Sequence, residues 1–167
     1  KKCFNHEIYI DEYFNLCVEC AIENYTNANL KVDLTGKSFL ITGGTSGIGK
    51  EAALELARAG AHVTITARDG AKGAAVVAEI AKERVDYKLL DLADLASVKN
   101  FAKEFTKPVD VLILNAGVMA TPFSLTKDGF EMQMGTNHLG HFALAGLLRE
   151  KVSHRIVGVS SQMHRAA

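Results

Sequence analysis

The stretch ITGGTSGIGKEA, which begins at Ile41, constrains the fold more than any other part of the chain. Four glycines fall within the seven residues from Gly43 to Gly49, directly after the apolar run SFLIT and directly before residues with helical spacing. Glycine loses more backbone entropy on folding than other residues do. Four glycines are therefore a cost that a plain connection between a strand and a helix would not require. A glycine-rich turn that opens a helix offers unpaired N–H groups and the positive end of the helix dipole, and both bind phosphate. The stretch therefore predicts an anion-binding turn between a strand and a helix.

Three motif patterns fit this stretch, and they predict different ligands. As G-x-x-x-x-G-K, from Gly44 to Lys50, it approaches a triphosphate-binding loop. That loop needs Ser or Thr after the lysine to bind magnesium, and Glu51 stands there instead. The other two patterns are dinucleotide-binding turns: G-x-G-x-x-A, which starts at Gly47, and T-G-x-x-x-G-x-G, which starts at Thr42. We therefore expect a dinucleotide rather than a triphosphate.

Short apolar runs alternate with helical patterns along the rest of the chain. The runs expected to form buried parallel strands are residues 38–42, 62–66, 87–90, 111–114 and 155–159. The expected helices are one with Ile48, Ala52 and Leu56 on one face, residues 71–81, one with Leu95, Val98, Ala102 and Phe105 on one face, and residues 129–148. This order predicts an α/β fold: a doubly wound parallel sheet of the Rossmann type with right-handed crossovers. In such sheets the ligand lies beyond the carboxyl ends of the strands.

Composition narrows the class of protein. The chain has 167 residues, of which 48% are hydrophobic, enough for one globular core. Its 19 basic and 19 acidic side chains balance, so there is no electrostatic case for binding nucleic acid. The longest apolar runs are far shorter than the roughly 20 residues that span a bilayer. We expect a cytoplasmic protein with no membrane span, although the chain begins with Lys1 rather than Met, which leaves an upstream targeting segment open.

The first 34 residues are expected to form a helical leader and linker, with the Rossmann domain at 35–167. The leader contains the spacings C-x-x-H and C-x-x-C, formed by Cys3, His6, Cys17 and Cys20. These spacings could in principle hold zinc. Cys17 also falls on the apolar face of an amphipathic helical pattern, which explains it better. We therefore expect no metal site, and the confinement of cysteine to the leader favours a reducing compartment.

Four motifs occur in a characteristic order: TGGTSGIG from Thr42, NAG from Asn115, NHLGHF from Asn137 and IVGVSS from Ile156. Together they resemble the short-chain dehydrogenase/reductase family over residues 37–161. The phrases SLTKDGFE and TNHLGHF further resemble its retinol-dehydrogenase-like branch, which includes the WW-domain oxidoreductases. The resemblance favours the T-G-x-x-x-G-x-G pattern. It implies hydride transfer between a nicotinamide cofactor and a carbonyl or alcohol, with a small molecule as the partner and a homo-oligomer left open.

The resemblance also implies which residues contact the cofactor: Gly43, Thr45, Ser46, Gly47, Ile48, Gly49, Asp91, Leu92, Asn115, Ala116 and Gly117. Two of these have structural alternatives, since Asp91 could cap the following helix and the NAG motif could be a strand-ending turn. Where NAD-specific members carry an acidic residue after the second strand, this chain has neutral Ala67 followed by Arg68. A guanidinium can bind a 2'-phosphate bidentately, so we expect NADP(H) over NAD(H). A solvated loop charge is the alternative interpretation of Arg68.

The catalytic residues implied by the resemblance are an Asn, a Ser, a Tyr and a Lys. Asn137 matches the first and Ser161 the second, with Ser160 as an alternative for the serine. The Tyr-x-x-x-Lys pair belongs after the serine, and the printed residues do not include it. We therefore expect a fragment with an incomplete sheet, an unpaired fifth strand, cofactor binding without turnover, and an enzyme only in the longer relative. The alternative is a non-catalytic nucleotide-binding or interaction protein.

Overall fold

The computed structural model describes residues 32–80 and 84–161. Asp33–Gly158 form one compact unit, to which residues 159–161 do not belong. Residues 1–31 of the expected leader, with its cysteines, lie outside the described residues.

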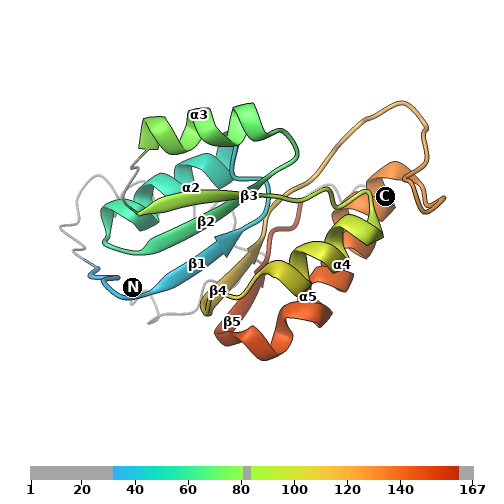
Figure 1. Cartoon of the computed structure of the whole chain (residues 1–167). Helices are drawn as coiled ribbons and strands as arrows, with labels where there is room; N and C mark the ends of the chain where they lie inside the picture. Colours follow the sequence, from blue (N-terminus) through green and yellow to red (C-terminus); the bar gives the residue numbers. More distant parts are fainter. Residues whose placement is uncertain (1–31, 81–83, 162–167) are drawn as a thin grey trace, which may run out of the picture. The chain divides into compact units, whose positions relative to one another are not determined.

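A parallel sheet forms the centre of this unit (Figure 1). Its order is β3-β2-β1-β4-β5, and every neighbouring pair is parallel. The strands are β1 Ser38–Ile41, β2 His62–Ala67, β3 Val85–Leu89, β4 Val109–Leu114 and β5 Val152–Gly158. The chain runs outward from β1 to β3 and then crosses back to β4, so the direction of winding reverses beside β1. This confirms the doubly wound Rossmann-type fold.

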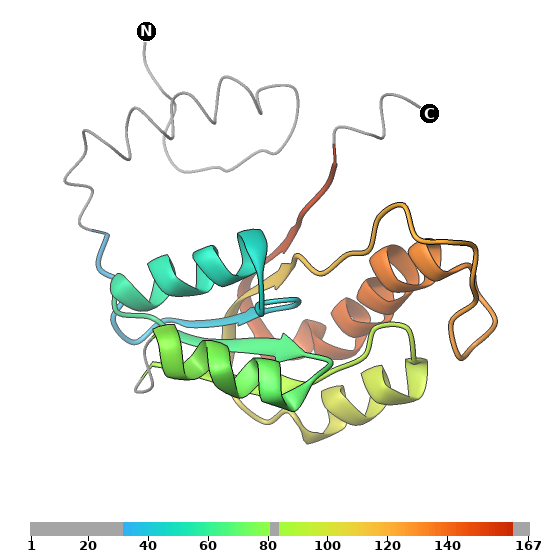
Figure 2. The ribbon, with the colours of Figure 1, turned by 90° about the horizontal axis from the view of Figure 1, so that it is seen from above.

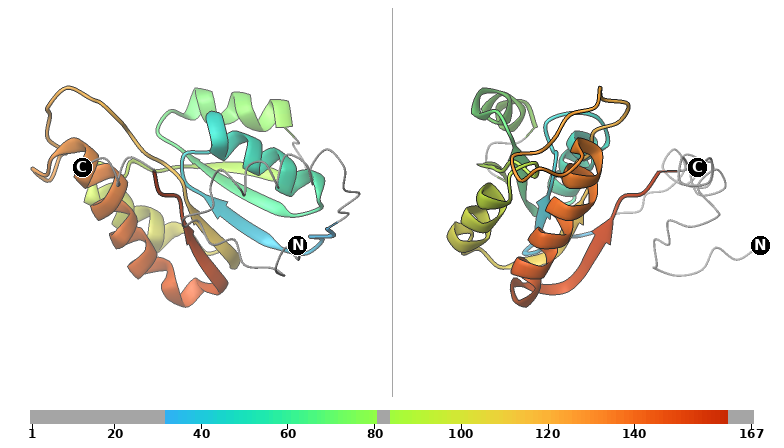
Figure 3. Two further views of the ribbon diagram at one scale, coloured as in Figure 1. Left: turned by 180° about the vertical axis from the view of Figure 1, so that it is seen from behind. Right: turned by 90° about the vertical axis from the view of Figure 1, so that its right-hand side faces the viewer.

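Helices cover the sheet in two layers (Figures 1 and 3). One layer contains α2 Gly47–Arg58 and α3 Gly70–Ile80. The other contains α4 Leu95–Glu104 and the continuous helical segment made of η1 Met134–Gly140 and α5 His141–Leu148. A short 3₁₀ turn, η2 Arg149–Lys151, leads into β5.

An apolar core lies on each face of the sheet, because side chains alternate between the two faces along each strand. Leu40 is completely buried with Leu112 and Leu144 between the sheet and the layer of α4 and α5. Its neighbour Ile41 is completely buried on the other face, in a cluster with Ile65 and with α2 and α3. The strands are therefore apolar on both faces, as a central parallel sheet requires.

The fourth predicted helix is wrong at its start. The segment expected at 129–148 becomes helical only at Met132, and its first half, η1, is π-helical. Gly129 has φ +82° in a turn where the Thr126 N–H donates to the Phe130 carbonyl at 2.8 Å. This turn competes with a helix for the same backbone groups, and the helical spacing in the sequence did not reveal it. Figure 2 shows the connection that contains the turn, in orange, arching away from the sheet.

The outer strands also differ from their predicted bounds. The third starts at Val85 rather than residue 87, and the fifth spans Val152–Gly158 rather than 155–159. Among the described residues β5 pairs only with β4, and Ile156 on it is 41% exposed. In the described part of the chain β5 is thus an edge strand, and it carries the polar residues Ser153, His154 and Arg155 as well as apolar ones.

We predict that Leu144→Ala lowers the free energy of unfolding by about 2–5 kcal/mol, because it leaves a cavity where α5 meets the sheet. Leu147→Ala, three residues away on the same helix and 49% exposed, is the matched control and should change it by less than about 0.5 kcal/mol. Urea denaturation of both variants measures the difference. Equal losses would contradict this assignment of the two faces of α5.

Candidate functional site

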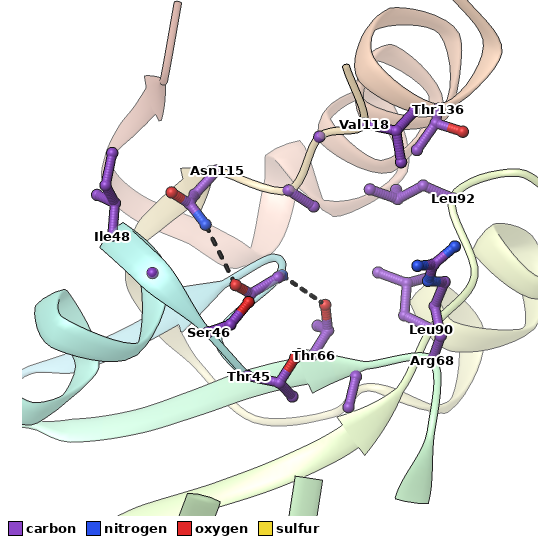
Figure 4. A pocket seen from close by; sticks show the side chains of 15 residues that line it. Thr45, Ser46, Ile48, Thr66, Arg68, Leu90, Leu92, Asn115, Val118 and Thr136 are labelled. Carbon is purple, nitrogen blue, oxygen red and sulfur yellow. Dashed lines mark hydrogen bonds between the residues drawn. The ribbon is translucent and has the colours of Figure 1, made fainter. Parts of the chain in front are cut away.

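A pocket of about 460 Å³ lies at the carboxyl ends of the central strands (Figure 4). It is lined by the loops that follow β1, β2, β3 and β4, by the end of β2, by the start of α2 and by one residue of η1: Gly43, Thr45, Ser46, Gly47, Ile48, Thr66, Ala67, Arg68, Leu90, Leu92, Asn115, Ala116, Gly117, Val118 and Thr136. The reversal of winding beside β1 leaves this crevice open, and it is the usual ligand position in such sheets. The structure thus brings most of the residues predicted to contact a cofactor into one pocket.

The glycine-rich turn lies against the end of β4. A Cβ atom on Gly43 would stand 2.8 Å from the Ala116 Cα, and φ at Gly43 is +69°. A Cβ on Gly49 would stand 2.5 Å from both the Asn115 Nδ2 and the Gly43 carbonyl oxygen. These distances are too short for any side chain. Gly49 is not one of the lining residues, and its part is to let the turn lie close to Asn115. Glycine is required here by close packing as well as by backbone conformation.

Hydrogen bonds hold the turn from both sides. The Asn115 side chain donates to the Thr42 carbonyl at 3.0 Å and to the Gly43 carbonyl at 3.3 Å. From β2, the Thr66 hydroxyl accepts the Gly43 N–H at 3.3 Å. Figure 4 draws two of these bonds, which reach the turn from opposite sides. The turn is therefore fixed before any ligand arrives.

The N-terminus of α2 differs from those of α3 and α4. The Asp69 carboxylate accepts first-turn N–H groups of α3 at 2.8 and 3.3 Å, and Asp94 does the same for α4 at 2.9 and 3.2 Å. Ser46, which precedes α2, makes no such side-chain bond. Among residues 32–80 and 84–161, no side chain thus accepts the first N–H groups of α2, at the place where an anion would bind.

Ala67 and Arg68 stand where β2 meets the pocket. Ala67 is 4% exposed, while Arg68 is exposed. Figure 4 shows Arg68 and Ile48 at opposite ends of the pocket, with the glycine turn between them. A ligand that reached both residues would have to be extended and would cross the turn at its middle, as a dinucleotide does.

Of the two residues after β3 that are predicted to contact the cofactor, Asp91 and Leu92, only Leu92 lines the pocket. Leu92 lines the pocket, as does Leu90, which the sequence did not single out. Asp91 is not among the lining residues, and its carboxylate accepts the Ala93 N–H at 2.9 Å. The N-cap of α4 is Asp94 rather than Asp91. Contact between Asp91 and an adenine stays a prediction.

Asn137 lies on η1 and binds the loop after β4. Its side-chain oxygen accepts the Val118 N–H and its side-chain nitrogen donates to the Val118 carbonyl, both at 2.8 Å. A π-helical segment of this kind often marks a functional position. Ser160 and Ser161 lie outside the compact unit that contains the pocket, and the catalytic assignments of Asn137 and Ser161 stay predictions.

Several site residues were missed by sequence reasoning. Besides Leu90 they are Thr66, Val118 and Thr136, which line the pocket, and His141, which lies behind it. Thr66 could have been found as the last polar residue of its predicted strand. The others follow from how loops fold back over the sheet, which spacing alone does not reveal.

The comparisons with known proteins agree with this geometry. Residues 37–166 match the family described as short chain dehydrogenase. Retinol dehydrogenase 11 of Homo sapiens is 49% identical over 144 aligned residues, and the match covers 80% of this chain and 45% of that protein. The chain thus spans about half the length of the curated relatives it matches.

Two solved structures illustrate the fold. An uncharacterised protein from Mycobacterium paratuberculosis shares 49% identity with a TM-score of 0.76, over 79% of this chain and 48% of that one. A blue fluorescent protein from a metagenomic library, solved in complex with NADPH, shares 30% identity with a TM-score of 0.68, over 81% of this chain and 60% of that one. The chain therefore belongs to the short-chain dehydrogenase/reductase family, with retinol dehydrogenases among its relatives.

The described residues contain neither a candidate membrane span nor a candidate metal site. None of their helices is both long and apolar enough to cross a bilayer. No group of three or more His, Cys, Asp or Glu side chains in residues 32–80 and 84–161 could hold a metal ion.

We predict that Gly49→Ala lowers the free energy of unfolding by about 1–3 kcal/mol, since its methyl group would collide with the backbone of the turn. Gly146→Ala is the matched control on α5, where a Cβ meets nothing within 4 Å. It should stabilise the helix by up to about 1 kcal/mol. Chemical denaturation compares the two, and an unchanged stability of the Gly49 variant would contradict the close packing of the turn.

A second prediction concerns pH. Burial lowers the pKa of His141 from its ordinary value of 6.5, although its bond to the Asn137 carbonyl opposes the shift. The unfolded chain therefore takes up this proton first as the pH falls. Above about pH 6.5 the free energy of unfolding should not depend on the protonation of His141. As the pH falls below this value, the free energy of unfolding should decline by at most about 1.4 kcal/mol per pH unit, until the folded protein is protonated too.

Urea midpoints between pH 5 and 7.5 measure this decline. It should be smaller in His141→Phe, because that variant has no proton to take up there. The control is His138→Phe, which removes an exposed histidine of the same helical segment and should leave the decline in place. Identical pH profiles for the wild type and His141→Phe would refute the assignment.

Proposed function

We propose that this chain binds NADP(H) in the pocket beside β1, as the cofactor half of an oxidoreductase that transfers hydride between nicotinamide and a carbonyl or alcohol. The observation that carries the proposal is Arg68, exposed at the end of β2 next to the buried neutral Ala67. Among the described residues that line the pocket, Arg68 alone is charged.

Electrostatics favours a 2'-phosphate over a free ribose. In the described part of the chain, Arg68 has no hydrogen bond or ion pair that would occupy its guanidinium. A ribose hydroxyl offers a guanidinium a neutral acceptor, whereas a 2'-phosphate offers a bidentate, charged one. The neutral side chain of Ala67 adds no carboxylate that would repel the phosphate. The related structure solved with NADPH supports the same choice.

The remaining parts of an extended dinucleotide match the rest of the pocket. The uncapped N-terminus of α2 and the glycine turn suit the pyrophosphate. Ile48, which is 69% exposed at the opposite end from Arg68, suits the nicotinamide ring. When bound, the cofactor would supply the hydride, and this chain would bind and orient it.

Asn137 and Ser161 are the proposed catalytic residues. The sequence printed above contains no Tyr-x-x-x-Lys pair after Ser161. We therefore infer that these 167 residues bind the cofactor without turning over substrate by themselves. The cytoplasmic location and a homo-oligomer also stay proposals. The competing function is a non-catalytic nucleotide-binding or interaction protein, for which β5, with Ile156 41% exposed, would offer a contact surface.

Titration of the purified chain with NADPH and NADH, followed by cofactor fluorescence, tests the proposal. Wild type should prefer NADPH. Arg68→Ala should weaken NADPH binding by about ten- to a hundredfold, because a hydrogen-bonded charge pair contributes about 1.5–3 kcal/mol, and should leave NADH binding nearly unchanged.

Arg58→Ala provides the matched control. Arg58 is an exposed arginine in the last turn of α2, where it pairs with Glu55, and it does not line the pocket. Its loss changes the net charge equally but should leave both affinities unaltered. Equal affinities for the two cofactors that survive Arg68→Ala would overturn the 2'-phosphate assignment, and no binding of either cofactor would overturn the dinucleotide site.

A further inference from the structure

His141, the first residue of α5, is buried behind the pocket and joins two of its walls. It is only 6% exposed. Its Nε2 atom lies 2.8 Å from the Thr42 hydroxyl, and its Nδ1 atom lies 2.9 Å from the Asn137 carbonyl oxygen. One imidazole ring therefore touches the strand that leads into the glycine turn and the backbone of Asn137 on η1.

The Thr42 hydroxyl has two further partners, and both of them donate to it. It accepts the Asn115 N–H at 2.9 Å and the Ala116 N–H at 3.0 Å, at the place where β4 ends. A hydroxyl has two acceptor lone pairs and one proton, so both lone pairs are in use and the proton has to be donated. The nearest acceptor is His141 Nε2 at 2.8 Å, while the alternative, the Ile113 carbonyl, is 3.5 Å away.

This count assigns the tautomer of the ring. Because Thr42 donates to Nε2, that nitrogen carries no proton, and the neutral imidazole carries its proton on Nδ1. The Nδ1–H then donates to the Asn137 carbonyl, so every polar atom in the chain of bonds has a compatible partner. Only one direction of donation satisfies the whole arrangement, from the Asn115 and Ala116 amides through Thr42 and His141 to Asn137.

We propose that His141 is a positioning residue of the cofactor site, which holds the Asn137 backbone in register with the Thr42 hydroxyl and with the strand-end amides of Asn115 and Ala116. The inference rests on the proposed function, because it assigns His141 to the same pocket. Asn137 in turn binds both backbone groups of Val118, which lines the pocket. Through one ring, the glycine turn, the end of β4 and the loop after β4 are fixed relative to one another.

The neighbouring histidine offers a natural comparison. His138 is exposed on η1, and its ring stacks on Phe142 with a centroid distance of 6.3 Å. It has no bond to Thr42 or to the Asn137 carbonyl among the described contacts. Substitutions at His138 therefore control for the loss of an imidazole from the same helical segment.

The first test uses the unmodified protein. Long-range proton–nitrogen NMR on the ¹⁵N-labelled chain should show His141 as a single neutral tautomer at pH 7, with the proton on Nδ1 and a bare Nε2. His138 should show the mixture of tautomers typical of an exposed imidazole. A proton on Nε2, or a mixture of tautomers at His141, would overturn the proposal without any variant having to fold.

The second test separates the two bonds with three variants. His141→Phe replaces the imidazole with another aromatic ring and removes both bonds, so NADPH should bind about tenfold more weakly. His141→Asn retains an amide near the place of Nδ1, so it should preserve the backbone amide shifts of Val118 and disturb those of Asn115 and Ala116. His141→Gln reaches the place of Nε2 and should give the opposite pattern.

The outcomes distinguish positioning from packing. If His141→Phe folds and binds NADPH as tightly as wild type and His138→Phe do, the ring only fills space and the proposal fails. If wild type does not bind NADPH at all, the proposed function fails, and the amide shifts of the Asn and Gln variants still decide whether His141 positions the loops. If those two variants perturb the same amides equally, the proposal fails.

Discussion

The site depends on how closely the backbone of the glycine turn approaches the end of β4. Gly43 stands so near to Ala116, and Gly49 so near to Asn115, that no side chain fits between them. The approach lets the Asn115 amide reach the carbonyls of Thr42 and Gly43. It also brings two amides at the end of β4 onto the Thr42 hydroxyl at the end of β1. The turn is therefore shaped by the neighbouring strand as much as by its own conformation.

The helix termini show how the protein distributes its negative charge around the pocket. Asp69 and Asp94 occupy the N-termini of α3 and α4, where a carboxylate stabilises a helix. At α2 the protein places serine and glycine and leaves the first N–H groups to a ligand. The unpaired N–H groups at a helix N-terminus can thus serve stability, where an aspartate accepts them, or ligand binding, where no aspartate is present.

The sequence predicted the fold and the glycine-rich half of the site because both produce local patterns. A buried parallel strand is a short apolar run, and a turn without side chains is a cluster of glycine. The connection before η1 could not be predicted in this way, since the turn at Gly129 is stabilised by bonds between Thr126 and Phe130 that helical spacing conceals. His141 escaped notice for a related reason. Its partners Thr42 and Asn137 become neighbours only when β1, β4 and the helical segment pack together.

The strand order has a consequence for how the protein reaches its native state. The bonds between Thr42 and the end of β4 join residues more than 70 positions apart in the sequence. Contacts of such long range require the closure of a large loop, so they are slow to form. A ligand held between these strand ends binds only the closed arrangement and would stabilise it by mass action. The pocket thus lies where the two halves of the sheet meet, and a bound ligand would hold these two halves together.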